Sequence, residues 1–446
     1  MALSIGGEVQ TIKALSVRSA GIAFPIVDPK EADAQYGGEF VRPRYTPAYW
    51  MGLLEVSTRA ARCAKALARA AAGLGVSAYV PEHVSGTGRR NLIAAAQRDA
   101  DELLQIADRP NASFESLCEV LYKADYDLVG SGNGYLETAE TNREAGGAVE
   151  GILHAPCVNI RVSKHLDRYV RTFLTPTTSP ATTASHGFQF GRPIGGAVYY
   201  RRFGDDDPER RFIDRDTGDF YAEWPGALPV ERRGTALLHV KTYCPLDDYY
   251  GMPAVATALH AITGNWLRGV WNVNFLQNSA HVPFVILVKR GNLSPDSIEQ
   301  IELFLSREGV GVANAGRVMV LQPDLTRLVG GGEVNIEIVP LKVGVGDDAS
   351  FLEYGDANNL EIQEAFGIPD VYIAGGGGTN ATVRNVGATR QVAQEQVLSP
   401  ETDCWEHALN TSVAPRVGGG RARFKLRRPD NLDTIQKAAV LQKLSE

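Results

Sequence analysis

One stretch of this sequence restricts the possible folds more than any other, because residues 252–279 contain a single full charge, Arg268. Apolar residues recur along it every three or four positions, which predicts one long helix with Pro253 in its first turn. Such a helix would be about 42 Å long at 1.5 Å per residue. Its other faces carry Ala, Gly and Asn, so we expect protein on several sides of it. The pattern alone also fits an ordinary core helix.

The composition is that of a folded chain of several parts. The 446 residues, 44% hydrophobic and 22% charged, suffice for roughly two to four domains. A net charge of −7 argues against a tight, non-specific DNA binder. Five scattered cysteines without a CxxC pair predict neither a disulfide framework nor a zinc site, and favour synthesis in a reducing compartment.

We expect no membrane association. The first residues lack the charged and apolar pattern of a signal peptide. The longest apolar run, near Val282–Val288, is far shorter than the ~20 residues that span a bilayer. The sequence therefore predicts a soluble protein made inside the cell.

Residues 1–250 predict a region of mixed helices and strands with many loops. The expected elements are an extended arm over 1–45, helices over 46–77 and 89–106, a helix capped by Asn111, strands over 130–137 and 152–162, and a hairpin around Gly218.

The remainder predicts a more regular order of elements. The expected elements are a β-α-β-β unit with strands over 282–288, 317–321 and 333–339 and a helix from Ser294, then a helix over 350–366, a glycine-rich loop, a helix over 382–398 that breaks or kinks at Pro400, and a strand over 421–427. The helix over 350–366 opens with Ser350 and Glu353, a capping-box pattern. Six acidic residues and no basic residue occupy 347–366.

Several motifs have both a simple structural explanation and a functional one. The glycine-rich segment 375–380 lacks the Lys-Ser/Thr of a phosphate-binding P-loop, so a flexible loop is favoured. The basic face of strand 421–428 fits ion pairs or solvation as well as DNA contact. GTGRR (86–90) fits a turn with solvated arginines better than an anion site. Asp247 and Asp248 fit turn capping better than a shared metal ion.

The sequence offers no catalytic, metal-binding or cofactor-binding residues. It contains no G-x-S-x-G, HExxH or dinucleotide-binding fingerprint. We therefore expect a protein that is not an enzyme and binds no cofactor.

Three features occur in a particular order. A YGxP turn (Tyr250–Pro253) precedes the long helix, which ends in FLQNSAH; a small α/β insert leads to a helix ending in AFGIP (365–369); and a glycine loop leads to a helix ending near Pro400. Upstream, GNGYLE (132–137) enters a strand before a strand containing Pro156. Together these features, over roughly residues 100–430, resemble the portal proteins of tailed bacteriophages.

The resemblance implies an α+β portal fold that forms rings, usually of twelve subunits. Its implied parts are a wing (1–250), a stem helix (251–280), a clip (281–346), a second stem helix (347–366), a tunnel loop (367–383), a long wing helix with a wing strand (384–430) and a short C-terminal helix (431–446) in place of a crown.

The resemblance also implies functional residues. Candidates for DNA contact in the tunnel loop are Ala374, Gly375, Gly376, Gly377, Gly378, Thr379 and Asn380. Candidates for an acidic channel wall are Asp356, Glu361 and Glu364. Candidates for docking through the clip are Lys289, Arg290, Glu299, Glu302 and Arg317.

The implied function is that of a structural subunit at one capsid vertex of the virion, made in the cytoplasm of a bacterial host. Its partners would be further copies of the chain, the major capsid protein, the terminase large subunit, a head–tail adaptor or completion protein, and double-stranded DNA held without sequence preference. Twelve copies of a chain of charge −7 would carry about −84, which suits a conduit that must not hold DNA tightly. The alternatives are a multidomain enzyme with an unrecognised site in 1–250 and another ring protein of the head or tail.

Overall fold

The structure, a computed structural model, describes residues 37–86, 89–173, 196–277, 284–290, 335–340, 348–373 and 389–428. The chain divides into two compact units. The larger contains Ile26–Asn265 and Gly355–Glu446, and the smaller contains Met1–Pro25 and Trp266–Tyr354.

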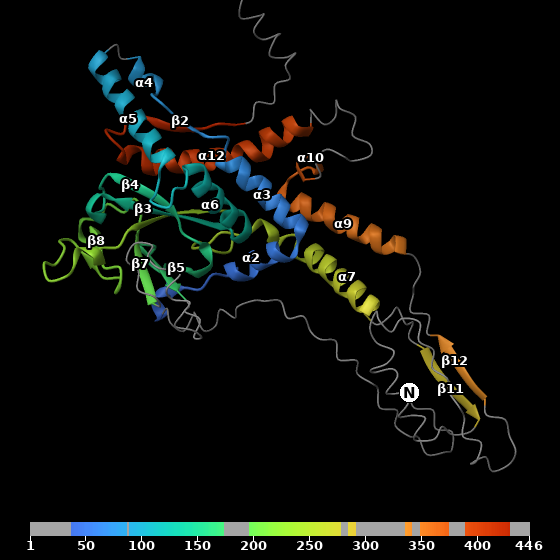
Figure 1. Ribbon diagram of the computed structural model, residues 1–446. Helices are drawn as coiled ribbons and strands as arrows, with labels where there is room; N and C mark the ends of the chain where they lie inside the picture. Colours follow the sequence, from blue (N-terminus) through green and yellow to red (C-terminus); the bar gives the residue numbers. More distant parts are fainter. Residues whose placement is uncertain are drawn as a thin grey trace, which may run out of the picture. The chain divides into compact units, whose positions relative to one another are not determined.

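A seven-stranded sheet forms the centre of the larger unit (Figure 1). Its strands, in spatial order, are β1 (Phe40–Val41), β5 (Ile160–Ser163), β6 (Arg168–Phe173), β7 (Gly196–Arg202), β10 (Ala236–Lys241), β3 (Asn133–Glu140) and β4 (Val149–His154). Neighbouring strands are antiparallel except for β7 and β10, which pair in parallel. The predicted strands over 130–137 and 152–162 are confirmed as β3 and as β4 and β5, which are separated at Pro156.

Apolar layers cover both faces of this sheet. Tyr135 and Leu136 are neighbours on β3, so their side chains point to opposite faces. Leu136 belongs to a cluster with Trp405 from the C-terminal part of the chain, whereas Tyr135 belongs to a second cluster with Tyr250. The strand is therefore a buried central strand, which matches its nearly continuous burial.

Helices pack around the sheet. Those between β1 and β3 in sequence are α2 (Pro47–Val56), α3 (Thr58–Ala72), α4 (Glu82–Ser85), α5 (Arg90–Asp108) and α6 (Leu117–Ser131). The helical stretch predicted over 46–77 is confirmed, but as two helices, α2 and α3. The chain leaves helical geometry at Ser57, whose side chain caps α3 by accepting from the Ala60 amide.

Helix α6 begins at a different cap from the predicted one. Ser116 and Glu119 form a reciprocal capping box. Asn111, the predicted cap, instead makes hydrogen bonds within the loop that precedes the helix. A side-chain cap five residues downstream satisfies the free amides better, because it lies directly at the first turn.

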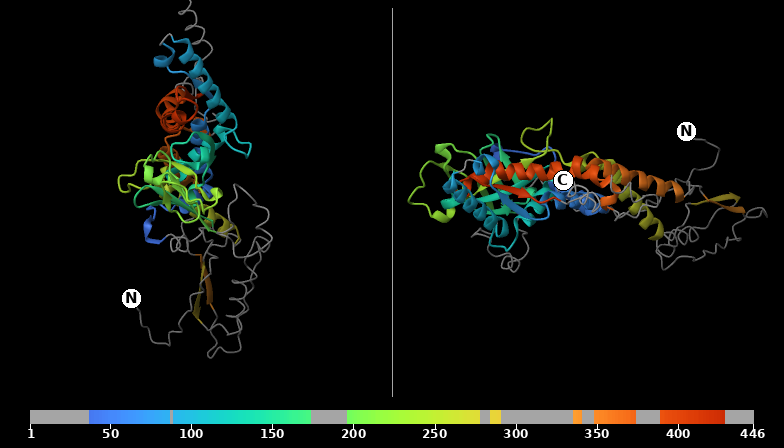
Figure 2. Two further views of the ribbon diagram at one scale, coloured as in Figure 1. Left: turned by 90° about the vertical axis from the view of Figure 1, so that its left-hand side faces the viewer. Right: turned by 90° about the horizontal axis from the view of Figure 1, so that it is seen from above.

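The predicted helix near Pro400 is one continuous rod in its described part, residues 389–416 (Figure 2). It contains a π-helical turn (Gln394–Leu398), α12 (Ser399–Ala408), a second π-helical turn (Leu409–Val413) and a 3₁₀ turn (Ala414–Arg416). Pro400 does not break it. The π-helical turn comes just before the proline, where the regular hydrogen-bond ladder cannot continue.

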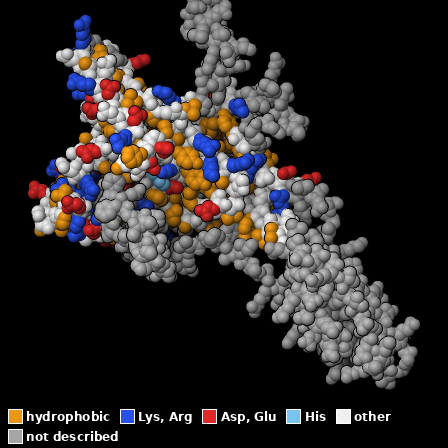
Figure 3. All heavy atoms as spheres, in the orientation of Figure 1, with side chains coloured by type: hydrophobic (Ala, Val, Ile, Leu, Met, Phe, Trp, Pro, Cys, Tyr) orange, Lys and Arg blue, Asp and Glu red, His pale blue; other side chains and the backbone are white. Residues whose placement is uncertain are grey.

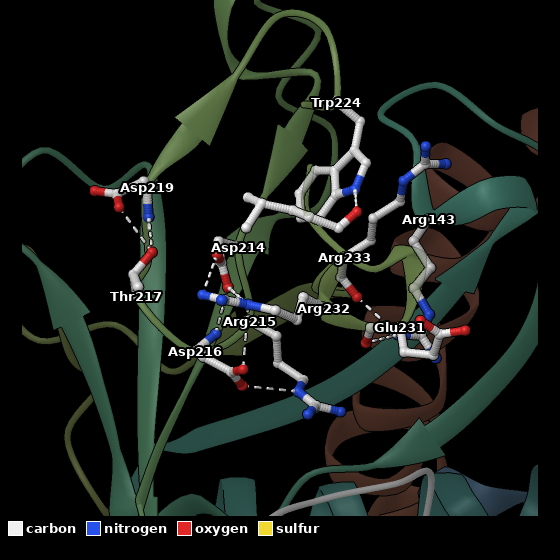
Figure 4. A network of polar contacts seen from close by, with 11 residues as sticks. Arg143, Asp214, Arg215, Asp216, Thr217, Asp219, Trp224, Glu231, Arg232 and Arg233 are labelled. Carbon is white, nitrogen blue, oxygen red and sulfur yellow. Dashed lines mark hydrogen bonds and ion pairs between the residues drawn. The ribbon is translucent and has the colours of Figure 1, made fainter. Parts of the chain in front are cut away.

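Strand β13 (Arg423–Leu426) pairs with β2 (Val76–Tyr79), and the predicted alternation is confirmed. Phe424 and Leu426 are buried, while Arg423 and Lys425 point outward. A small hairpin of β8 (Phe212–Ile213) and β9 (Phe220–Tyr221) turns near Gly218 as predicted. A network of polar contacts fixes this insert, including the Arg232–Asp214 ion pair and the Trp224 Nε1 hydrogen bond to the Leu228 carbonyl, 3.0 Å (Figure 4).

The smaller unit contains β11 (Phe284–Arg290), which pairs antiparallel with β12 (Asn335–Pro340). These confirm the first and last strands of the predicted insert; its helix from Ser294 and its strand over 317–321 lie outside the described residues. Helices α7 (Leu259–Gln277) and α9 (Asp348–Phe366) have residues in both units.

Candidate functional site: the anchor of helices α7 and α9

The segment that leads into α7 is held against the sheet. The Tyr250 hydroxyl is buried, donates to the Val41 carbonyl (2.7 Å) and accepts from the Val162 amide (2.8 Å). Thr242 Oγ1 donates to the Met252 carbonyl at 2.6 Å. These bonds keep 250–252 non-helical, which explains why the α-helix begins at Leu259 and not at Pro253 as predicted. A 3₁₀ turn over Ala254–Ala256 fills the interval.

Asn133 is the polar centre of this anchor. Its side chain is completely buried. Its Oδ1 accepts from the Gly251 amide (2.9 Å) and lies 3.0 Å from His239 Nε2, while its Nδ2 donates to the Ser131 carbonyl (3.0 Å). One amide side chain therefore joins the end of α6, strand β10 and the segment that leads into α7.

His239 contributes as a neutral donor. Because an amide oxygen can only accept, the imidazole Nε2 must carry the proton. The ring stacks on Tyr135 with 4.3 Å between centroids. Burial, aided by the charges of Lys241 and Arg202, lowers the pKa of His239 to about 3, so the ring stays neutral at physiological pH.

Two glycines allow the backbones to meet at the anchor. Gly132 has φ +80°, and a Cβ added there would lie 2.5 Å from the Gly251 carbonyl carbon. A Cβ added at Gly251 would collide with the Gly132 carbonyl oxygen in turn. The glycines of GSGNGYLE and YGMP thus face each other. Two motifs that sequence analysis noted separately form one structure.

Helix α9 joins α7 through amide side chains. Asn265 Nδ2 donates to Asn359 Oδ1 at 3.1 Å, and Asn358 Nδ2 donates to Asn265 Oδ1 at 3.2 Å. Ile362 and Phe366 follow Asn358 at intervals of four residues, so they lie on the same side of α9, and both are buried. The pairing explains the asparagines among the small residues of the two helices, because amides can hydrogen-bond in both directions between closely spaced helices.

The predicted acidic residues lie on the opposite side of α9. At 100° per residue, Asp356, Glu361 and Glu364 fall within an arc of about 140°, facing away from the buried side of the helix. All three are exposed. None of the three forms an ion pair with a residue that the structure describes. The structure thus brings these three candidates together as one exposed acidic face.

The other predicted site residues cannot be placed in the same way. Lys289 and Arg290 lie in strand β11, whose side chains are not described. The remaining candidates lie outside the described residues: Ala374, Gly375, Gly376, Gly377, Gly378, Thr379, Asn380, Glu299, Glu302 and Arg317.

The basic strand near the C-terminus forms ion pairs with acids of its own chain. Arg421 pairs with Asp99 at 3.2 Å, and Lys425 pairs with Glu406 at 2.9 Å. Across the face shown in Figure 3, basic and acidic side chains are interspersed. This supports the structural explanation of the strand over the DNA-binding one.

A groove lies beside α9 in the larger unit. Its volume is about 770 Å³, and its walls include Leu360, Pro369 and Val397 from α9, the turn after it and the long helix. Leu360 and Val392 at this groove are 56% and 51% exposed. A mostly apolar surface of this kind is suited to contact with protein.

The sequence alone did not indicate Asn133, His239 or Asn265. The motif GNGYLE pointed to a glycine turn, but the roles of these three side chains depend on partners about one hundred residues away. Within the described residues, no group of three or more His, Cys, Asp or Glu could hold a metal ion. None of the described helices has the length and hydrophobicity of a membrane span.

Known proteins show similarity to this chain at several levels. A family model described as "Phage portal protein" matches residues 58–446. The phage-like element PBSX protein XkdE of Bacillus subtilis is 23% identical over 420 residues, which cover 91% of this chain and 81% of XkdE. The uncharacterised protein YqbA of Bacillus subtilis is 25% identical over 326 residues, which cover 70% of this chain and 60% of YqbA.

A solved structure shares the fold. The neck of an empty gene transfer agent (GTA) particle, computed with C6 symmetry, contains a chain with a TM-score of 0.51 and 20% identity, covering 93% of this chain and 92% of the other. This likeness agrees with the α+β portal architecture expected from the sequence. Because the family model covers most of its length, this chain belongs to the phage portal protein family.

Proposed function

We propose that the chain is the portal subunit of a phage or phage-like particle, and that copies of it form a ring, usually a dodecamer in this family, at one capsid vertex. The ring would dock the terminase large subunit, conduct double-stranded DNA during packaging and ejection, and join head to tail through an adaptor or completion protein. Its role would be structural, within the virion and beside the major capsid protein, after synthesis in the cytoplasm of a bacterial host.

The anchor of α7 and α9 is the observation that carries this proposal. A conduit needs its wall helices fixed to a rigid body, so that passing DNA does not displace them. Here Asn133, Tyr250 and the Gly132–Gly251 contact fix α7 to a seven-stranded sheet, and Asn265 ties α9 to α7. We assign 251–280 and 347–366 as the paired stem helices on this basis.

Surfaces left open on the single chain support ring formation. Leu360 and Val392 border an apolar groove of about 770 Å³, which a neighbouring copy would cover. The remaining assignments follow the family: a wing (1–250 and 384–430), a clip (281–346) with its docking residues, and a tunnel loop (367–383) that meets DNA.

The exposed acidic face of α9 would guide DNA without holding it. Carboxylates repel phosphates, and a protein that neutralised phosphates would bind the duplex and slow its passage. Asp356, Glu361 and Glu364 are exposed on one side of α9, which suits a channel wall.

The mass of the purified assembly distinguishes a ring-forming portal subunit from the alternative functions. Native mass spectrometry and negative-stain images of the purified chain are expected to show rings with a central hole. A chain that stays monomeric or dimeric at high concentration, and that is absent from purified particles, would overturn the proposal.

A further inference from the structure

One exposed aromatic side chain is held in a strained backbone conformation. Phe114 is 83% exposed and has a φ of 60°. The left-handed region is unfavourable for a bulky L-residue. Strain of this kind persists only where the surroundings impose it, and it occurs preferentially at functional positions. The strain and the exposure of Phe114 together make it a candidate functional residue.

The loop around Phe114 is fixed by its neighbours. Asn111 is buried; its Nδ2 donates to the Ile152 carbonyl (3.3 Å) and to Glu115 Oε2 (3.0 Å), and its Oδ1 accepts from the Ser113 amide (2.9 Å). Glu115 forms an ion pair with Lys123 of α6. The loop thus presents an aromatic ring to solvent without the entropy loss that ordering a flexible loop on binding would cost.

A groove lies next to this ring. The Arg109 guanidinium lies 5.2 Å from the centroid of the Phe114 ring and also lines a groove of about 580 Å³ at the end of α5. Ile106, Val149 and Val417 form apolar parts of its wall. The C-terminal end of α5, the start of β4 and the turn after the long helix meet there (Figure 1). Aromatic and arginine side chains beside an apolar pocket are typical of binding hot spots.

The groove carries a net negative charge, because two acidic side chains and one basic side chain, that of Arg109, line it. Glu102 and Asp108 line it and are exposed. Neither has a hydrogen bond or ion pair with any part of the chain that the structure describes. Asp99, one turn before Glu102 on α5, is already paired with Arg421. Two carboxylates are therefore available to a basic side chain brought by a partner.

We propose that Phe114 and this groove form a docking surface for a segment of a different protein, one that places an apolar side chain in the groove next to a Lys or Arg. The apolar wall of the groove and the two exposed carboxylates define the chemistry of this partner, an apolar side chain next to a basic one. A second copy of the chain in the groove is an outcome of the test. This inference rests on the proposed function, since the partner would be another component of the particle.

Substitutions in the free chain test whether Phe114 is kept for binding. Phe114→Gly removes the φ strain, so its Tm is expected to equal or exceed that of the wild type by about 1–3 °C, while incorporation of the chain into particles falls. Val230→Ala, at another exposed apolar residue, is the matched control and should change neither. A Phe114→Gly chain that loses Tm and keeps full incorporation would show a structural role only.

Crosslinking identifies what covers the surface. Particles are made with photoreactive p-benzoylphenylalanine in place of Phe114 or, as control, Val230, and crosslinked peptides are sequenced. The expected product joins position 114 to a different protein, at a segment with a basic residue beside an apolar one. Glu102→Lys with Asp108→Lys should reduce its yield about tenfold without affecting the control position.

Other outcomes overturn the inference. A crosslink to a second copy of the chain would assign the surface to the ring, and particles that contain the chain without any crosslink at 114 would leave the surface unoccupied. Particles that lack the chain altogether would instead overturn the proposed function, on which the inference depends.

Discussion

At the scale of single residues, the anchor depends on two backbones that approach as closely as glycine permits. Gly251→Ala would place a methyl group against the Gly132 carbonyl, and neither backbone can move without breaking the bonds of Asn133 and Thr242. We expect a loss of about 1–3 kcal/mol in the free energy of unfolding, as for overpacking in a core. Chemical denaturation measures it.

The matched control is Gly52→Ala. Gly52 lies in helix α2 with no atom within 4 Å of an added Cβ, so alanine should stabilise the chain by about 0.5–1 kcal/mol. Equal effects of the two substitutions would contradict the close contact of Gly132 with Gly251.

Two acids on α6 have opposite surroundings and give a prediction about pH. Asp125 Oδ1 accepts from Trp405 Nε1 at 2.7 Å, whereas its Oδ2 is buried without a hydrogen bond from the described residues. Burial, and then the charge of Glu401, raises the pKa of Asp125 well above its ordinary value. A raised pKa favours the protonated folded state, so its contribution is present at low pH and is lost as pH rises through the folded pKa.

Asp125→Asn removes this titration and keeps an acceptor for Trp405. We expect its Tm to exceed that of the wild type by roughly 2–4 °C at pH 8, with the gain shrinking toward pH 5. Asp127 is the control, because its Oδ2 accepts from the Cys157 amide at 3.0 Å and lies 2.9 Å from His154 Nε2. Asp127→Asn should lower the Tm at both pH values. A lower Tm for Asp125→Asn at pH 8 would show that Asp125 is ionised in the fold.

At the scale of elements, regular periodicity was enough to predict the helices and strands but not the residues at which they begin and end. The apolar stripe of 252–279 and the alternation of 421–427 predicted α7 and β13, because each pattern records one buried face. The start of α7 was missed by about six residues. Tertiary hydrogen bonds from Thr242 and Asn133 hold its first residues extended, and no local signal reports them.

The candidate site was predictable to a similar extent. The exposed acids of α9 follow from the composition of one helix, so the sequence placed them on one element. The predicted cap at Ser350 is wrong, because α9 begins at Asp348 and Ser350 lies within it. Asn133 and Asn265 act through partners distant in sequence, and only the folded chain reveals them. The sequence predicted a cap at Asn111 and nothing for Phe114, because the backbone strain of Phe114 depends on the bonds that Asn111 makes in the folded chain.

The pairing of α7 with α9 gives a prediction at this scale. Asn265→Ala removes two hydrogen bonds and leaves the buried Asn358 side chain without its acceptor. An unsatisfied buried amide costs about 1–3 kcal/mol, and the loss should be concentrated at α9. Hydrogen exchange of residues 355–366 is expected to accelerate about tenfold or more.

Asn272→Ala provides the comparison, because Asn272 is exposed on the same helix α7. It should leave exchange in α9 unchanged. If both variants behave alike, α9 is held by its apolar contacts alone and the amide bonds contribute nothing to the pair.

At the scale of the whole molecule, the proposed ring would have to combine firm wall helices with weak affinity for the DNA that it would conduct. The sheet and the anchor supply firmness within one chain. The long helix is held in turn by Trp405 on Asp125 (2.7 Å) and by Arg416 on Glu140 (2.6 Å). Repulsion of phosphate then has to come from surfaces that face the axis, and the acidic face of α9 has the required sign.

Neutralising that face tests the idea directly. The triple variant Asp356→Asn, Glu361→Gln, Glu364→Gln keeps the shape of α9 and removes three charges per chain, or about 36 in a ring of twelve. We expect rings of normal mass that retain more DNA at low salt and package it more slowly, with the difference disappearing as salt is raised. A control with the same charge change on the wing, Glu209→Gln, Glu223→Gln, Asp219→Asn, should package normally. Equal rates and equal DNA retention in the two variants would mean that α9 does not face the duplex, and that the channel wall must be sought on another element.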